Sequence, residues 1–495
     1  MTSDDSSSAG GFGRVGAWVR THKSTSLILA GAVAVVLFGG GALAAGAATA
    51  PSSSTAGGPQ GAGGGGASSA PSPTASKTPA APARPVPTTL PGATTLRTCS
   101  VDSQAAAAGL GTFQGTVVNS STGQTLFDRN GSTPVATASV MKTLTASVAL
   151  AVLGPDYRFT TTVNGSGAGG TISLIGGGDA TLSATPVGSE SYYKGAPKLA
   201  TLAADVKAKL GSNAITTIDL DSTYWNNADA YDSTWPVTER TIGYQPEVVP
   251  LMVDGDRADP TQQTSPRSTD PVMRAGQAFQ QALVAAGVNG ASTAKLVQAK
   301  NTSHNTLAKV QSQPISTLIG QMIPNSDNTL AEMMARVSSK VSGADGSAAS
   351  LTDVYKKVLN KTYGLDTSKL TIIDGSGESY KDGVPSSFEA ALMTLVLGRN
   401  ANLGILYDAL PISGQTGTLA TRFTGANAIA RGQVHAKTGS IATAYTLAGV
   451  IDAKDGTKLT FAFFAEGNLN AATSMQALDT LTTAVYSCGA NLSNN

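Results

Sequence analysis

The chain has few charged residues, few histidines and few cysteines. Charged residues make up 13% of its 495 positions, against roughly 25% in an ordinary globular domain, and we interpret this composition as that of an exported protein. Three histidines and two cysteines leave few groups for a zinc site or a Ser-His-Asp triad. Two cysteines also exclude a small disulfide-rich scaffold, whereas the length allows about two to four domains.

Positive charge is also scarce in the part of the chain that could fold. The net charge is +1, but the basic excess lies before residue 98, and acidic residues slightly outnumber basic ones beyond it. A nucleic-acid-binding surface needs basic residues to neutralise phosphates. We therefore expect no nucleic-acid partner.

One long apolar run lies near the N-terminus. Residues 27–48 carry no charge, and about 20 such residues cross a bilayer as a helix. Basic residues precede the run, which predicts a cytoplasmic tail at 1–25, a transmembrane anchor at 26–48 and an exterior location for the rest. The run ends in small residues, so a signal peptide that is cleaved, leaving a secreted protein, is the alternative.

Residues 49–98 consist mostly of Pro, Ser, Thr, Ala and Gly. Such a segment cannot bury enough apolar surface to offset its ordering entropy, which predicts a disordered tether. Cys99 and Cys488 lie almost at the two ends of the remaining chain. In an oxidising exterior they would form a disulfide that clamps the ends together, the alternative being two unrelated free thiols.

The remaining chain has strand patterns at both ends. Residues 116–129 and 444–467 each read as a hairpin around a turn. A helix follows the second hairpin, because apolar residues recur at helical spacing at Met475, Leu478, Leu481 and Val485. We expect an α+β fold in which the two ends build one antiparallel sheet, with long helical stretches between them.

Ser139 and Lys142 are the first candidate catalytic residues. Apolar residues follow at intervals of four and Gly154 ends the pattern, so Ser139 would begin a buried helix. Residues three apart share one face of a helix, which brings the lysine amine to the serine hydroxyl. A lysine that burial keeps neutral can accept the proton of a serine nucleophile.

Ser326 and Asn328 open a second amphipathic helix that ends at Gly343. Taken alone, this pattern is more typical of helix capping, since Ser, Asp and Asn are the preferred N-cap residues. Both patterns also have competing copies elsewhere in the chain. The serine–lysine pattern recurs at Ser191 with Lys194 and at Ser292 with Lys295, both in polar, turn-rich surroundings, and the serine–asparagine pattern recurs at Ser303 with Asn305.

Lys437, Thr438, Gly439 and Ser440 form the third candidate, directly before the last hairpin. On an edge strand the lysine and threonine would offer a cation and a hydroxyl to a substrate carboxylate, and the glycine would leave room for a peptide alongside. An ordinary turn before a strand is the alternative. In chain order the three candidates are SxxK (139–142), SxN (326–328) and KTG (437–439). These three motifs in this order are nevertheless the set found in β-lactamases and penicillin-binding proteins.

With these motifs the chain resembles the penicillin-binding D-alanyl-D-alanine carboxypeptidases/endopeptidases of the low-molecular-mass class C type. The resemblance implies a β-lactamase/transpeptidase-like α+β fold, an antiparallel sheet flanked by helices, with a domain inserted between SxxK and SxN. It places the peptidase domain at 99–164 and 301–490 and the inserted domain at 165–300. Six blocks carry it, at 174–182, 270–279, 326–336, 374–379, 410–423 and 435–440.

The resemblance also implies an activity and a role for each candidate residue. Ser139 would form an acyl-enzyme with a peptidoglycan stem peptide or cross-link, Lys142 would accept its proton, and Ser326 would relay that proton to the departing amine. β-Lactam antibiotics would acylate the same serine in the bacterial cell wall compartment, and the reaction would need no metal or organic cofactor.

The other motif residues would bind the substrate. The resemblance implies that Asn328 orients the substrate amide, that Lys437 and Thr438 hold the terminal carboxylate on the Gly439 strand, and that the amides of Ser139 and Ser440 form the oxyanion hole. The chain departs from the family pattern at Glu378, where leucine is usual, and at Ala180, His435 and Ser440. None of these departures removes a reacting group, so they concern substrate preference.

Two other functions share these motifs. A serine β-lactamase would need fast deacylation, which in one class uses an ExxLN glutamate, and the only such letters, Glu466 to Asn470, come after the KTG motif. A non-catalytic wall-binding module would keep the fold without the chemistry. Because every expected reacting residue is present, the sequence favours the carboxypeptidase.

Overall fold

The computed structural model describes residues 96–494. The predicted cytoplasmic tail, the membrane anchor and nearly all of the tether lie outside this range. Among the described residues, no helix is both long enough and apolar enough to cross a membrane.

The first sheet is built from both ends of the described chain, as the hairpin patterns predict. Its five strands have the order β10-β11-β12-β1-β2, and every neighbouring pair is antiparallel. The strands are β1 (Thr112–Asn119), β2 (Thr125–Arg129), β10 (Val434–Ile441), β11 (Ala444–Asp452) and β12 (Lys458–Glu466). The expected pairing of the two ends is therefore confirmed.

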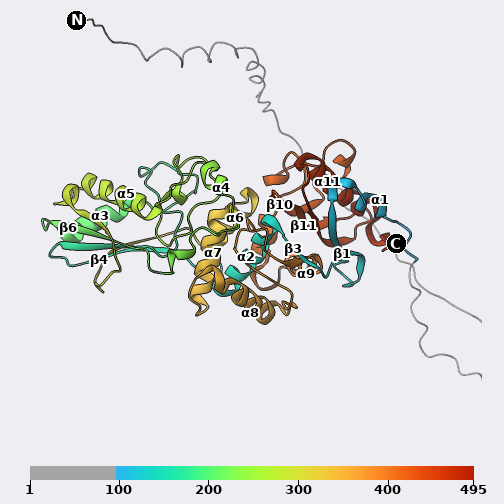
Figure 1. Ribbon diagram of the computed structural model, residues 1–495, viewed down its shortest axis with the longest axis horizontal. Coiled ribbons are helices and arrows are strands. Elements are labelled where there is room, and N and C mark those ends of the chain that lie inside the picture. Colours follow the sequence, from blue (N-terminus) through green and yellow to red (C-terminus); the bar gives the residue numbers. More distant parts are fainter. Residues whose placement is uncertain (1–95, 495) are drawn as a thin grey trace, which may run out of the picture. The chain divides into compact units, whose positions relative to one another are not determined.

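Helices cover both faces of this sheet (Figure 1). Helix α11 (Ala471–Cys488) packs on one face and α9 (Ser386–Leu397) on the other. The side chains of β12 pack on both faces of the sheet, because successive side chains point to opposite sides of a strand. Phe461 and Phe463 join the cluster beneath α11, whereas Phe464 packs with Val140 in the turn that carries Ser139.

Further helices fill the chain between the two halves of the sheet. Helix α2 packs against α6, α7 and α8, and its first ten residues are buried. The bounds are α2 (Met141–Val152), α6 (Ile315–Asn325), α7 (Asn328–Val341) and α8 (Leu351–Tyr363). The first turn of α2 is thus fully buried, and Ser139, just before it, is partly exposed.

A second five-stranded sheet lies between α2 and α6 in the sequence. Its order is β7-β6-β5-β4-β8, with parallel pairing of β5, β6 and β7 and antiparallel pairing of β4 with β5 and β8. The strands are β4 (Thr160–Gly165), β5 (Gly170–Ile175), β6 (Ile215–Asp221), β7 (Lys295–Gln298) and β8 (Thr306–Gln311). We propose that this sheet, with α3 (Leu199–Leu210) and α5 (Pro271–Ala285), is the inserted domain; its strands begin and end slightly beyond residues 165–300.

Cys99 and Cys488 form a disulfide, with their Cα atoms 5.5 Å apart. The bridge joins the segment before the first sheet to the end of α11. Nearby, Cys99 also makes backbone hydrogen bonds with Asn491 and Ser493. The two ends of the described chain are thus tied together covalently and by hydrogen bonds.

Candidate active site

Ser139 lies in a tight turn at the start of a buried helix, as its spacing predicts. The turn η2 (Ala138–Val140) runs directly into α2. Ala138 has a φ of +45°, a left-handed conformation that costs a non-glycine residue roughly 1–3 kcal/mol and is concentrated at functional sites. The half-buried Ser139 side chain is the part of this turn that faces the pocket.

Lys142 lies beneath Ser139 and is completely buried. Its Nζ is 2.8 Å from Ser139 Oγ and donates to Asn328 Oδ1 and to the Ser376 carbonyl, both at 2.7 Å. Burial lowers the pKa of the Lys142 amine to about 8, although nearby carboxylates, Glu378 foremost, oppose the shift. A substantial fraction of Lys142 is therefore neutral near pH 8 and able to accept a proton.

Ser326 and Asn328 stand at the junction of two helices. Ser326 ends α6 in a left-handed conformation, with a φ of +56°, and Asn328 is the first residue of α7. The capping role falls to Asp327, whose side chain accepts a hydrogen bond from the Leu330 amide. Ser326 is consequently not the cap of α7, and its hydroxyl accepts a 2.9 Å hydrogen bond from Lys437 Nζ.

Lys437 to Ser440 lie on β10, the edge strand of the first sheet, as expected. Lys437 is fully buried, and burial together with the charge of Lys142 lowers the pKa of its amine. Thr438 Oγ1 donates to Thr418 Oγ1 at 2.8 Å. A Cβ on Gly439 would collide with the Ala138 side chain and the Thr137 carbonyl, so this glycine allows β10 to approach the turn that carries Ser139.

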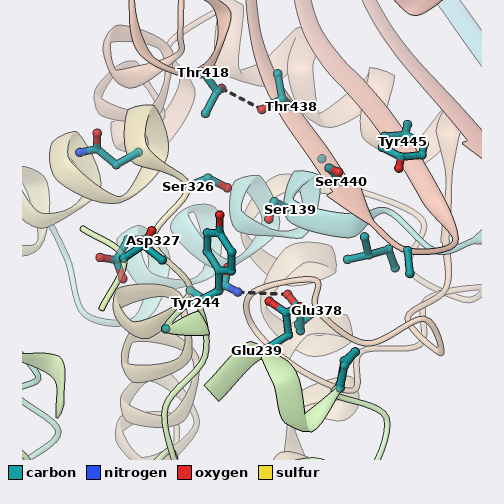
Figure 2. A pocket seen from close by; sticks show the side chains of 18 of the residues that line it. Ser139, Glu239, Tyr244, Ser326, Asp327, Glu378, Thr418, Thr438, Ser440 and Tyr445 are labelled. Atoms are coloured by element: carbon teal, nitrogen blue, oxygen red, sulfur yellow. Dashed lines mark hydrogen bonds between the residues drawn. The ribbon is translucent and has the colours of Figure 1, made fainter. Parts of the chain in front are cut away.

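The three motifs line one cavity of about 610 Å³. Figure 2 shows Ser139, Ser326 and Ser440 around the same space, with Thr438 two residues before Ser440 on strand β10. The two lysines lie beneath this surface with no exposed area. The wall is completed by residues from both halves of the chain, among them Glu239, Tyr244, Arg257, Glu378 and Tyr445.

The loop from Asp374 to Ser379 is one of the family blocks in the sequence and contains Glu378, a departure from the family pattern. Its Ser376 carbonyl accepts a hydrogen bond from Lys142, and Glu378 Oε2 accepts one from Asn328 Nδ2 at 3.1 Å. The Glu332 carboxylate holds the loop in place by accepting hydrogen bonds from the Gly375 and Ser376 amides. No spacing rule links this loop to the other motifs, because tertiary packing alone brings it to Lys142.

Arg257 from the long segment after β6 reaches the SxN motif. Its Nη2 donates to Asp327 Oδ2 at 2.9 Å, and both side chains are almost fully buried. Its guanidinium also stacks over the rings of Tyr192 and Tyr193. This contact was not predicted, since the two residues lie 70 positions apart with no common pattern.

The competing copies of the motifs do not form sites of this kind. Ser191 Oγ donates to the Tyr193 carbonyl, and Lys194 is exposed. Ser292 and Lys295 are both exposed on the surface, and Ser303 lies in the loop before β8. In residues 96–494, no group of three or more His, Cys, Asp or Glu side chains is arranged to hold a metal ion.

Comparison with known proteins identifies the family. The model of the D-Ala-D-Ala carboxypeptidase 3 (S13) family matches residues 98–266 and 256–485. The chain belongs to this family. The predicted family is thereby confirmed, and so is the predicted enzyme class, a serine-type D-Ala-D-Ala carboxypeptidase.

Two curated relatives and one solved structure are similar to this chain. Carboxypeptidase DacB of Mycolicibacterium smegmatis is 34% identical over 386 residues, 77% of this chain and 81% of that protein. A D-alanyl-D-alanine carboxypeptidase of Actinomadura sp. is 27% identical over 433 residues, covering 71% and 77%. The crystal structure of penicillin binding protein 4 (dacB) from Haemophilus influenzae has a TM-score of 0.64 at 20% identity, covering 76% and 96%, which confirms the fold class.

Proposed function

We propose that this serine-type D-Ala-D-Ala carboxypeptidase trims or cuts peptidoglycan stem peptides through an acyl-enzyme on Ser139. The observation that carries this proposal is the hydrogen-bonded group of Ser139, Lys142 and Asn328 at the floor of the cavity. It supplies a nucleophile, a buried amine of lowered pKa and a polar group that holds the amine in place. A wall-binding module would need none of these features.

Acylation begins when Lys142 takes the proton of the Ser139 hydroxyl and the oxygen attacks the carbonyl of the penultimate D-alanine. The amides of Ser139 and Ser440 stabilise the resulting oxyanion, a contribution of about 3 kcal/mol per donor in comparable enzymes. Ser326, which is hydrogen-bonded to Lys437, passes the proton to the departing D-alanine amine. A β-lactam amide enters the same cavity and acylates the same oxygen.

Lys437 and Thr438 bind the terminal carboxylate of the substrate. In the free site the pKa of Lys437 is lowered by burial and by Lys142, and an incoming carboxylate favours the charged form of the Lys437 amine. The Thr438 hydroxyl supplies a second contact from the same edge strand. This pairing favours peptides that have a free C-terminal carboxylate as substrates.

The test compares the full-length protein with Ser139→Ala. The wild-type protein should be labelled covalently by a fluorescent penicillin and should release D-alanine from a defined D-Ala-D-Ala stem peptide, whereas the variant should do neither. Ser191→Ala, at the competing copy, is the matched control and should retain both activities. Labelling of the Ser139→Ala protein would overturn the proposal.

The same preparation distinguishes carboxypeptidase from endopeptidase action. Monomeric and cross-linked muropeptides are incubated separately and the products are identified by mass. Cleavage of the cross-linked dimer into monomers supports endopeptidase activity, and release of D-alanine from monomers alone restricts the enzyme to trimming.

We further propose that the N-terminal segment, residues 26–48, anchors the protein in the bacterial cell membrane, with residues 49–98 as the tether and the enzyme outside the cytoplasm. The charge-free run and the basic residues before it support this arrangement. Extraction of the protein from membranes only by detergent is the expected result. Recovery in the culture medium with a new N-terminus after residue 48 would instead show cleavage.

A further inference from the structure

Glu378 has no task in the acylation steps, yet its carboxyl group stands in the cavity. Oε2 accepts the 3.1 Å hydrogen bond from Asn328 Nδ2, and Asn328 Oδ1 in turn accepts from Lys142 Nζ. Figure 2 shows the Glu378 carboxyl group on the side of the cavity below Ser139, with the dashed line marking its bond to the amide nitrogen. Two hydrogen bonds therefore connect this carboxylate to the Lys142 amine.

The second oxygen of Glu378 is open to the cavity. Oε1 has no hydrogen-bond partner among residues 96–494, and it is not one of the buried polar atoms that lack one. Because the side chain lines the cavity that also contains Ser139, Oε1 is placed to accept a proton from a water molecule there. A carboxylate with one oxygen fixed and the other free is suited to orient such a water.

The backbone around Glu378 is fixed against the turn that carries Ser139. Gly377 has a φ of +80°, and a Cβ at this position would overlap the Ala138 carbonyl. The buried Asp374 carboxylate accepts from the Gly377 amide at 2.6 Å and from the Ser379 amide at 2.7 Å. Glu378 is therefore held beside the nucleophile by the residues on both sides of it.

The surroundings of Glu378 suit a base that works near neutral pH. Burial raises the pKa of its carboxyl group to about 7, and the negative charges of Glu239 and Asp374 add to this shift. The Lys142 ammonium and the hydrogen bond from Asn328 oppose it. A general base is most effective when its pKa is close to the working pH.

We propose that Glu378 is a catalytic residue of the second half-reaction, the general base that activates water to hydrolyse the acyl-enzyme on Ser139. The inference rests on the proposed function. One class of serine β-lactamases uses a glutamate through a water in this step; here a glutamate from a different segment, without the ExxLN pattern, would do so.

The step balances with the groups in the cavity. The water oxygen forms a bond to the ester carbon while one water proton passes to Glu378. The tetrahedral adduct then collapses by breaking the bond between the ester carbon and Ser139 Oγ. That oxygen takes a proton from the Lys142 ammonium, whose Nζ is 2.8 Å away, and the proton on Glu378 returns to Lys142 through water in the cavity. The products are the free carboxylic acid and the starting enzyme.

This assignment predicts a second activity. An enzyme with its own deacylation base releases not only the stem peptide but also the penicilloyl group, so it hydrolyses penicillin slowly instead of remaining blocked. Glu378 would then set how long a β-lactam inhibits this enzyme.

The test uses Glu378→Gln in the full-length protein. Glutamine keeps an oxygen that can accept the hydrogen bond from Asn328, but it cannot act as a base. The variant therefore retains the positioning of Asn328 and loses only the proton transfer from water. Acylation by a fluorescent penicillin should stay within about 3-fold of wild type, whereas loss of the label should slow by about 10²-fold or more. Glu190→Gln, an exposed glutamate outside the cavity, is the matched control and should change neither rate.

Four outcomes of this experiment are distinguishable. Slow label loss with normal acylation supports the proposal, as does the same behaviour in Glu378→Leu. Unchanged label loss in Glu378→Gln overturns it while leaving the carboxypeptidase assignment intact, because acylation still occurs. Equal losses in both steps also overturn it, since they indicate that Glu378 acts only by positioning Asn328. Absence of labelling in the wild-type protein would instead contradict the proposed function itself.

Discussion

Lys142 combines complete burial with three hydrogen-bonding neighbours, one of which is the nucleophile. Burial lowers the pKa of its amine from 10.5 to about 8. The proton acceptor is the neutral amine, so acylation by penicillin should increase as pH rises from 6 and level off above about 8. The second-order rate constant for labelling, measured across this pH range, tests whether acylation increases with pH. A rate that falls as pH rises would contradict the role of Lys142.

Replacement of Lys142 by arginine gives a second test of the same group. Arginine keeps a positive charge but does not lose its proton in proteins, so acylation should fall by at least about 10²-fold at every pH. The labelling rate of Lys142→Arg is compared with that of Lys194→Arg, the exposed lysine of a competing copy. Normal labelling of Lys142→Arg would show that the base is a different group.

The junction between α6 and α7 depends on a contact from a distant segment. Asp327 caps α7 and accepts from Arg257, and the two side chains are 2% and 1% exposed. Removal of one partner of a buried ion pair leaves the other charge unpaired, so Arg257→Met should lower the free energy of unfolding by about 3–5 kcal/mol. Urea denaturation followed by circular dichroism measures this change.

The control for that prediction is the exposed pair of Arg399 and Asp408, whose side chains are 52% and 62% exposed. Arg399→Met should change the free energy of unfolding by no more than about 1 kcal/mol. Equal effects of the two substitutions would show that Arg257 does not support the SxN motif through a buried charge.

The same junction marks the limit of what the sequence predicts locally. The apolar spacing correctly predicts the positions of α2 and α7, although both helices are buried on nearly every side over most of their length. It cannot decide which of three neighbouring residues caps α7, since Ser326, Asp327 and Asn328 are all favourable caps. The choice depends on Lys437 and Arg257, which arrive from other parts of the chain.

Residues of all three motifs could be recognised in the sequence because their order is specific, and the structure brings them to one cavity. Glu378 and Arg257 could not be assigned a role in this way, because no motif spacing relates them to Ser139 or Ser326. The second sheet was also not predicted. Its parallel pairs join β5, β6 and β7 across long connections, and all four residues of β7 are at least partly exposed, which leaves little alternation to detect.

The disulfide between Cys99 and Cys488 spans 389 residues. Its loss should lower the free energy of unfolding by about 2–5 kcal/mol, mainly because the unfolded chain gains freedom. The thermal midpoint of the double variant Cys99→Ala/Cys488→Ala should therefore be below that of the oxidised wild-type protein. Adding a reductant should lower the wild-type midpoint and leave the variant unchanged; a variant as stable as wild type would contradict the expectation.

The order of strands in the first sheet has a consequence for when the enzyme becomes active. Ser139 is synthesised long before β10, which carries Lys437, and β12, which pairs with β1. An unfinished chain therefore has its nucleophile without the strand that completes the cavity. Hydrolysis of cell-wall peptides can therefore begin only after β10 has been synthesised and has paired with β11.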